Sequence, residues 1–231
     1  RAINDRIGPK GGFTTMLPSA SAVKVGQLLE DRFKLPAWQI TATASDANRA
    51  VLRWCRAITG RKKILVFNHC YHGAVDETYV NLDHGKPEAD RALIGEPNDL
   101  TQFTKVIEFN DIPALEAALA PGDVACVLAE PIMTNVGMVL PDEGFHSALR
   151  EITRRAGTLL IIDETHCMSS GPGGYTGEHG LEPGGLPPVH AADPRPDGRA
   201  VGDRSLWLGP AALAGDDHAV HHRSLDDGAQ R

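Results

Sequence analysis

The chain has 231 residues, of which 42% are hydrophobic, and a formal net charge of −7. This length and composition fit one large α/β domain or two small ones. The acidic balance argues against binding of a nucleic-acid backbone. No apolar run approaches the ~20 residues that span a bilayer, so we expect no membrane segment.

The two ends of the chain and its cysteines bear on where the protein resides. The first residues are polar and lack the apolar core of a signal peptide, and no Met begins the chain. We therefore expect a cytoplasmic protein and a fragment boundary at residue 1. The cysteines form no C-x-x-C pair, which favours reduced thiols over disulfides or a zinc site. They are Cys55, Cys70, Cys126 and Cys167.

Apolar residues at helical spacing predict two helices in the first quarter of the chain. The first is expected over 19–34 and the second over 45–59. Ser45 has a side chain suited to the N-cap of the second helix, and Gly60 is suited to its end.

Apolar strands then alternate with helices from residue 63 to residue 163. The predicted strands are 63–68, 106–109, 124–130 and 158–163, and the predicted helices are 111–120 and 142–156. The polar stretch 75–104 predicts an excursion over the surface. This alternation indicates a mostly parallel sheet with helices on both faces. Ligands of such sheets bind at the carboxyl ends of the strands, so polar residues that follow strands are the candidate site.

The composition changes after residue 183. Residues 184–231 contain seven Asp but no Glu, Lys, Ile or Phe, and the alternation of strand and helix stops. A disordered polar tail is one interpretation, and translation of a shifted reading frame is the other. We therefore expect an N-terminal segment over 1–40, a large domain over 41–183 and an aberrant tail.

Six short motifs occur in a characteristic order. They are Thr41–Asn48 (TATASDAN), Thr59–Ile64 (TGRKKI), Cys70–Gly73 (CYHG), Ala129–Met133 (AEPIM), Leu160–Glu164 (LIIDE) and Gly171–Tyr175 (GPGGY). Their order and spacing over residues 15–183 resemble the class-III aminotransferases, the group that includes glutamate-1-semialdehyde aminomutase. The resemblance implies an incomplete large domain of the fold type I of pyridoxal-phosphate-dependent transferases, with pyridoxal 5′-phosphate as the cofactor.

The resemblance assigns a phosphate-binding end and a ring-binding end to the site. Ala44 and Ser45 belong to the phosphate cup, where a helix N-terminus offers unpaired N–H groups. The family usually has Gly-Thr there, so Ala44 is a departure from its pattern. Tyr71 stacks on the pyridine ring, and His72 completes its motif.

The remaining assigned residues follow two later strands. Asp163 pairs with the protonated pyridine nitrogen, which keeps the ring able to accept electrons. Thr165 packs on the other ring face, His166 approaches the ring hydroxyl, and Glu130 supports the site. A buried carboxylate needs such a partner, because an unpaired buried charge is strongly unfavourable.

Several of these residues also fit simpler roles. Ser45 can be a plain N-cap, and Tyr71 can be a core tyrosine. His69 and His72 suggest a metal pair, but no third ligand is evident, so we expect no metal site. The apolar strand before Glu164 resembles a Walker B strand, yet the chain has no G-x-x-x-x-G-K-[ST] segment.

One residue that the resemblance requires is missing. In this family a Schiff-base lysine follows the Asp-Glu strand, but the last lysine here is Lys105, well before Asp163. No catalytic residue can therefore be assigned. The first hypothesis is a homodimeric aminotransferase, acting on a small amino donor and an oxo-acid acceptor, that is truncated and impaired in this form. The second is a non-catalytic member that binds cofactor or a partner without covalent attachment. A general α/β binding module is a third.

Overall fold

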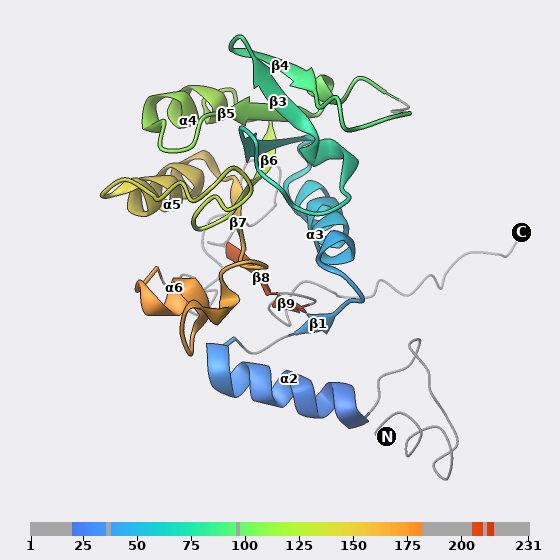
Figure 1. The fold of residues 1–231 in the computed structure, drawn as a ribbon, viewed down its shortest axis with the longest axis vertical. Helices are drawn as coiled ribbons and strands as arrows, with labels where there is room; N and C mark the ends of the chain where they lie inside the picture. The colour runs from blue at the N-terminus through green and yellow to red at the C-terminus, as the bar shows by residue number, and fades with distance from the viewer. Residues whose placement is uncertain (1–19, 36–37, 96–97, 182–204, 210–211, 215–231) are drawn as a thin grey trace, which may run out of the picture.

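A mixed sheet with helices on both faces forms the body of the protein (Figure 1). The computed structural model describes residues 20–35, 38–95 and 98–181, and the backbone of two strands at 205–209 and 212–214. The sheet order is β1-β9-β8-β7-β6-β2-β5. Its strands are β1 (Gln39–Ile40), β2 (Lys63–Phe67), β5 (Thr104–Ile107), β6 (Val124–Ala129), β7 (Leu159–Asp163), β8 (Ser205–Gly209) and β9 (Ala212–Ala214).

The helices match the predicted ones closely. They are α2 (Ala20–Phe33), α3 (Ala44–Thr59), α4 (Ile112–Leu119), α5 (Phe145–Ala156) and the short α6 (Gly174–Glu178). Three 3-10 turns accompany them: η1 (Asp76–Thr78), η2 (Leu100–Gln102) and η3 (Met168–Ser170). Gly60 ends α3 in the left-handed conformation, as the sequence predicted. Within the part of the chain that the structure describes, no helix combines the length and apolar character needed to cross a bilayer.

Strands β5, β2, β6, β7 and β8 pair in parallel, so the predicted parallel sheet is confirmed. Strands β9 and β1 join antiparallel at the β8 edge. All six residues of β6 and all five of β7 are buried, which explains their continuous apolar sequence. The carboxyl ends of β2, β6 and β7 therefore meet at one edge, and each is followed by candidate site residues.

Two separate cores lie on the two faces of the sheet. Alternate residues of each strand point to opposite faces, so Ile161 packs in the core under α3 while Ile162 packs in the core under α4 and α5. By the same alternation, Asp163 at the end of β7 lies on the α3 side. The face that carries Asp163 is thus the one on which α3 begins.

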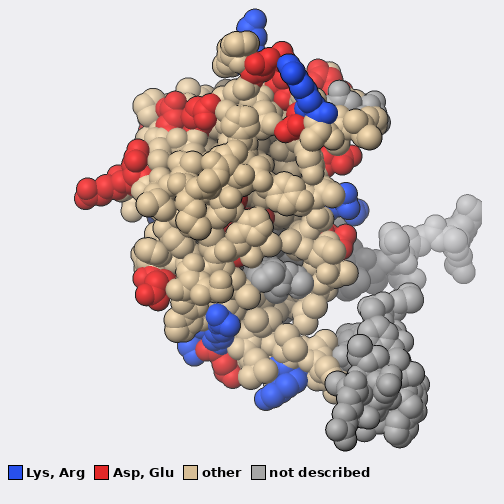
Figure 2. Space-filling view, in the orientation of Figure 1, with Lys and Arg blue, Asp and Glu red and all other residues tan. Residues whose placement is uncertain are grey.

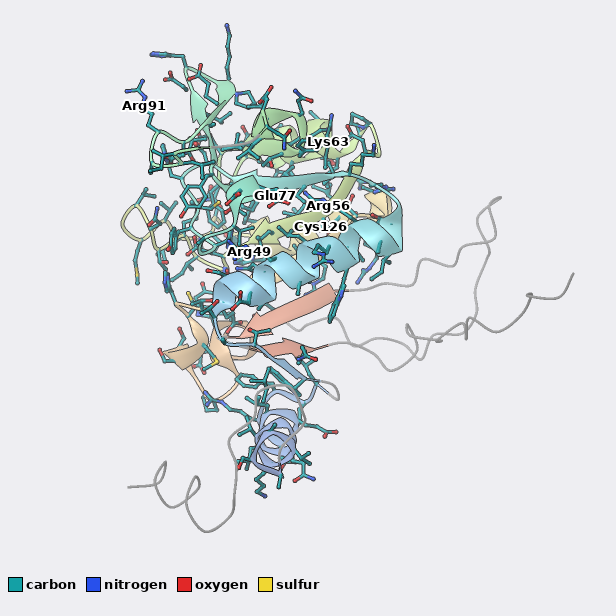
Figure 3. All side chains as sticks on the ribbon, turned by 90° about the vertical axis from the view of Figure 1, so that its right-hand side faces the viewer. Arg49, Arg56, Lys63, Glu77, Arg91 and Cys126 are labelled. Carbon is teal, nitrogen blue, oxygen red and sulfur yellow. The ribbon has the colours of Figure 1, made fainter. Side chains whose placement is uncertain are left out.

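Polar contacts fix α3 and the strand that follows it (Figure 3). Arg56 of α3 forms an ion pair with Glu77 of η1, with 2.8 Å between Nη1 and Oε1. Arg61 donates to the carbonyl oxygens of Val124 and Ala156 at 3.0 Å each. These bonds tie the segment that follows α3 to the start of β6 and to the end of α5.

The structure corrects one local prediction and adds detail to another. Thr43, not Ser45, is the N-cap of α3, and its hydroxyl oxygen accepts from the backbone N–H of Asp46. The excursion predicted over 75–104 contains an antiparallel hairpin beyond β5, formed by β3 (Val80–Asp83) and β4 (Lys86–Ala89). Its turn residues His84 and Gly85 both have positive φ, which is the requirement of a type I′ hairpin turn.

The tail after residue 183 differs in part from the prediction. Strands β8 and β9 belong to it and join the sheet beside β7, so strand structure does not stop at residue 183. The short apolar run at 205–209 is the feature that the composition of the whole tail concealed. Residues 182–204, 210–211 and 215–231 lie outside the described residues, as do residues 1–19, so the domain boundaries stay predictions.

Candidate functional site

The Asp163 carboxylate is the centre of a buried hydrogen-bonded cluster. It ends β7 and is only 3% exposed. Its Oδ2 atom accepts from Asn48 Nδ2 at 3.0 Å and from His72 Nδ1 at 2.9 Å. Its Oδ1 atom accepts from the backbone N–H and the hydroxyl of Thr165, at 3.0 Å and 2.6 Å. Three elements distant in sequence thus converge on one anion.

The pair between His72 and Asp163 is ionic. Burial alone would lower the pKa of His72, but its interactions with Cys70 and Asp163 outweigh burial and raise that pKa to about 10. Burial likewise acts to raise the pKa of Asp163, whereas the bond and charge of His72 hold that pKa well below its usual range. The imidazolium and the carboxylate are therefore both charged near neutral pH. The other ring nitrogen, Nε2, is buried and makes no hydrogen bond of ordinary geometry within the described residues.

Asn48 is a site residue that the sequence analysis missed. It lies on α3, is 1% exposed, and donates from Nδ2 both to Asp163 and to the carbonyl oxygen of His72 at 2.9 Å. Its Oδ1 atom is buried and has no partner within the described part of the chain. The available signal was a polar residue on the apolar stripe of a helix, since Ala47, Val51 and Leu52 share its buried face.

The N-terminus of α3 touches the turn that follows β2. The Ser45 hydroxyl oxygen accepts from the backbone N–H of Ala74 at 2.9 Å. Gly73 has φ +81, and a Cβ there would overlap the Ser45 hydroxyl, so only glycine allows this close approach. Ala44 is the first residue of α3, where backbone N–H groups have no partner inside the helix. The predicted phosphate-cup residues thus lie at a helix N-terminus, beside the Tyr-His-Gly turn.

A second series of hydrogen bonds includes Glu130, which follows β6 and is 4% exposed. Its carboxylate accepts from the hydroxyl of Thr134 at 2.7 Å and from the backbone N–H of Tyr71 at 3.5 Å. The Thr134 hydroxyl in turn lies 2.6 Å from Nδ1 of His166. Thr134 is the second residue that the sequence analysis missed. The Tyr71 side chain is 45% exposed, which is not the environment of a core tyrosine.

The eight predicted site residues therefore fall into three linked groups at one edge of the sheet. His72 and Thr165 bond to Asp163, Ser45 lies against the turn after His72, and Glu130 connects Tyr71 to His166. The backbone joins these groups, because the turn 71–73 takes part in all three and the turn 163–166 takes part in two. Ala44 adjoins Ser45 at the start of α3 and takes part through its backbone.

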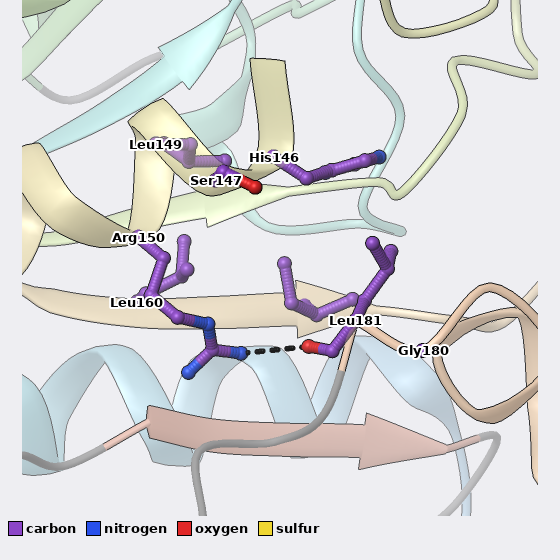
Figure 4. Close-up of a pocket in the computed structure, with 8 residues that line it drawn as sticks. His146, Ser147, Leu149, Arg150, Leu160, Gly180 and Leu181 are labelled. Atoms are coloured by element: carbon purple, nitrogen blue, oxygen red, sulfur yellow. Dashed lines mark hydrogen bonds between the residues drawn. The ribbon is translucent and has the colours of Figure 1, made fainter. Parts of the chain in front are cut away.

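A separate hollow lies on the opposite face of the sheet (Figure 4). It has a volume of about 310 Å³ and is lined by His146, Leu149, Leu160 and Ile162 among others. At the edge of this hollow, Arg150 Nη2 donates a hydrogen bond to the carbonyl oxygen of Leu181 at 3.0 Å. None of the predicted site residues lines it. The face drawn in Figure 2 has charged side chains mainly at its margins. Within the described residues, no cluster of His, Cys, Asp and Glu could hold a metal ion.

Comparisons with known proteins agree with this arrangement. Glutamate-1-semialdehyde 2,1-aminomutase of Bordetella avium is 32% identical over 190 residues, covering 79% of this chain and 44% of the relative. The crystal structure of a glutamate-1-semialdehyde-aminomutase from Pseudomonas aeruginosa PAO1 superposes with a TM-score of 0.73 at 54% identity, covering 79% of this chain and 41% of that one. A variant of the Pseudomonas enzyme in complex with PMP gives the same TM-score at 53% identity, with coverages of 78% and 41%.

The chain thus spans less than half the length of the relatives that it matches. The family model described as aminotransferase class-III matches residues 13–183, which include every predicted site residue. The chain belongs to the class-III aminotransferase family.

Proposed function

We propose that this chain supplies the cofactor-binding part of a pyridoxal-phosphate-dependent aminotransferase. The whole protein would move an amino group between an amino acid or amine and an oxo-acid. The observation that carries this proposal is the buried Asp163 anion, held charged by His72 at the carboxyl edge of the parallel sheet. The PMP complex of the Pseudomonas relative supports a cofactor of this kind.

The residues at the α3 N-terminus fit a phosphate group. The first N–H groups of a helix attract anions through unpaired donors and the positive end of the helix dipole. The Ser45 hydroxyl oxygen already accepts a hydrogen bond from Ala74, and no described residue accepts its proton, so that proton is available to a ligand. Gly73 brings the turn against the helix without a side chain in the way.

The residues beyond this turn fit a cationic aromatic ring. The half-exposed ring of Tyr71 offers a stacking surface for one face of the cofactor ring. Thr165, which follows β7, would pack on the other face. Asp163 provides the negative charge that would hold a ring nitrogen protonated. When bound, pyridoxal phosphate supplies an electron sink, because a protonated ring accepts the electron pair released at the substrate carbon. His166, Thr134 and Glu130 would keep the turn of Tyr71 in position.

A chain of residues 1–231 alone would bind the cofactor without a covalent bond. Its last lysine is Lys105, on β5, and the Nζ atom of that lysine is bound to Asp123 at 2.7 Å. We therefore propose that this sequence is impaired in catalysis by itself. A non-catalytic role in cofactor or partner binding is the second candidate, favoured by the same absence. By resemblance, we propose that the intact parent is a cytoplasmic homodimer.

Binding of pyridoxamine 5′-phosphate to the 231-residue chain tests the proposal, because this ligand needs no lysine. We expect saturable binding by calorimetry, weakened at least tenfold in Asp163→Asn, which removes the counter-ion and keeps the side-chain shape. The matched control Asp123→Asn removes an acidic group far from the site and should bind normally. Absence of saturable binding to the unaltered chain would contradict the proposed function.

Borohydride reduction tests whether the 231-residue chain holds the cofactor without a covalent bond. With pyridoxal 5′-phosphate, an enzyme that carries its own Schiff-base lysine traps one cofactor per site. We expect no such stoichiometric adduct with the 231-residue chain, despite saturable binding. A single labelled lysine, found by peptide mass spectrometry, would show that a lysine present in this sequence does reach the cofactor.

A further inference from the structure

The hydrogen bonds of Asp163 leave no acceptor position open. A carboxylate has about four lone-pair sites, two on each oxygen. Asn48 and His72 occupy Oδ2, while the backbone N–H and the hydroxyl of Thr165 occupy Oδ1. A ligand with a protonated ring nitrogen must therefore displace one of these four donors before it can pair with Asp163.

The four donors differ in how readily they can leave. Asn48 and His72 are each 1% exposed, and Asn48 also donates to the carbonyl oxygen of His72, so neither side chain can turn away without opening the core. The backbone N–H of Thr165 is fixed by the chain. The Thr165 hydroxyl belongs to a partly exposed side chain, and a change of χ1 rotamer moves it while the backbone stays in place.

We propose that the Thr165 hydroxyl is a displaceable donor, which occupies the Oδ1 lone pair of Asp163 until the protonated ring nitrogen of a ligand takes its place. This inference rests on the proposed function, because it concerns the same site and the same class of ligand. It assigns Thr165 a role besides packing on the ring: the residue sets how tightly a cationic heteroaromatic ring is held. Its hydroxyl keeps the buried carboxylate fully hydrogen-bonded when no ligand is present.

The role predicts different effects for a substitution that removes the hydroxyl and one that keeps it. Thr165→Val keeps the branched shape but leaves one lone pair of Oδ1 unpaired in the free protein. Binding then no longer has to break a charge-assisted hydrogen bond, so we expect the dissociation constant of pyridoxamine 5′-phosphate to fall by about tenfold. Thr165→Ser keeps the hydroxyl, and its dissociation constant should stay within about twofold of the unaltered chain.

The decisive measurement compares two ligands with the two variants and the unaltered chain by calorimetry. The second ligand is the deaza analogue of pyridoxamine 5′-phosphate, in which a C–H group replaces the ring nitrogen. It donates no conventional hydrogen bond to Asp163, so Thr165→Val should not tighten its binding. Circular dichroism checks that each variant folds, and Thr165→Ala, which also lacks the hydroxyl, serves if the valine variant does not.

The outcomes separate this inference from the proposed function. If the unaltered chain binds neither ligand, the proposed function fails. If it binds pyridoxamine 5′-phosphate but Thr165→Val binds no more tightly, the inference alone is wrong. If Thr165→Val bound both ligands more tightly by the same factor, the inference would also be overturned. That result would show that the hydroxyl acts through its size and not through the Asp163 lone pair.

Discussion

Replacement of Asp163 by Asn should destabilise the fold, because it breaks a buried ion pair and keeps the shape of the side chain. The carboxylate is 3% exposed and its His72 partner 1% exposed, with 2.9 Å between Oδ2 and Nδ1. The rise in the pKa of His72 from 6.5 to about 10 corresponds to ~5 kcal/mol of net interaction, to which both Cys70 and Asp163 contribute. Removing one partner of a buried pair costs about 3–5 kcal/mol. We expect a loss of about 3 kcal/mol in the free energy of unfolding at pH 6.

The size of this loss should depend on pH in a defined direction. Because the pKa of His72 is raised in the folded state, its contribution is fully present below pH 6.5 and is lost as pH rises toward 10. The pKa of Asp163 is depressed, so its contribution is present above the ordinary carboxyl value of 3.8 and is lost as pH falls below it. The difference between the two proteins should therefore be largest from about pH 4 to 6.5 and fall toward about 1 kcal/mol at pH 10.

Urea unfolding, followed by far-ultraviolet circular dichroism from pH 5 to 10, measures this difference. The control is Asp123→Asn. Asp123 contacts Lys63 at 2.9 Å and Lys105 at 2.7 Å, its side chain is 37% exposed, and it has no histidine partner among the described residues. The Asp123→Asn variant should lose about 1 kcal/mol or less in the free energy of unfolding, and this loss should not change from pH 5 to 10. An Asp163→Asn variant that loses equal stability at pH 6 and pH 10 would refute the assignment of a charged His72–Asp163 pair.

Three further substitutions test the surrounding cluster. Asn48→Ala should lower the free energy of unfolding by about 2 kcal/mol, because Asp163 and the carbonyl oxygen of His72 each lose a buried donor; equal stability in urea would contradict this. Gly73→Ala should cost about 2 kcal/mol or more, since its φ is positive and the added Cβ overlaps Ser45, and thermal unfolding would detect it. Ser45→Ala should leave stability within about 1 kcal/mol. It should nevertheless weaken binding of pyridoxamine 5′-phosphate more than binding of unphosphorylated pyridoxamine, and calorimetry with the two ligands decides.

The sequence was informative where one local pattern determined the structure. Continuous apolar runs such as that of β6 predicted a parallel sheet, because only strands covered on both faces can bury every residue. The hairpin β3–β4 was overlooked although its signals were present. Val80 and Leu82 alternate with polar residues, and His84-Gly85 supplies the two positive φ angles of its turn.

The site depended on contacts between distant residues, which a single sequence does not reveal. Asn48 and Asp163 are 115 positions apart, and neither residue alone indicates the other. Ser45 and Thr43 are both acceptable N-caps by type. In the structure Thr43 is the N-cap, and the Ser45 hydroxyl instead accepts from the backbone N–H of Ala74, 29 residues later. Family resemblance located Asp163, but its four hydrogen bonds became countable only in three dimensions.

The protonation state of the bound ring nitrogen tests the central claim most directly. Pyridoxamine 5′-phosphate labelled with ¹⁵N in its ring can be bound to the 231-residue chain at pH 8.5 and measured by nitrogen NMR. With Asp163 as counter-ion, the bound ring nitrogen should show the chemical shift of a protonated pyridine, and Asp163→Asn should shift it toward the neutral form. A neutral ring nitrogen in the complex with the unaltered chain would contradict the role proposed for Asp163.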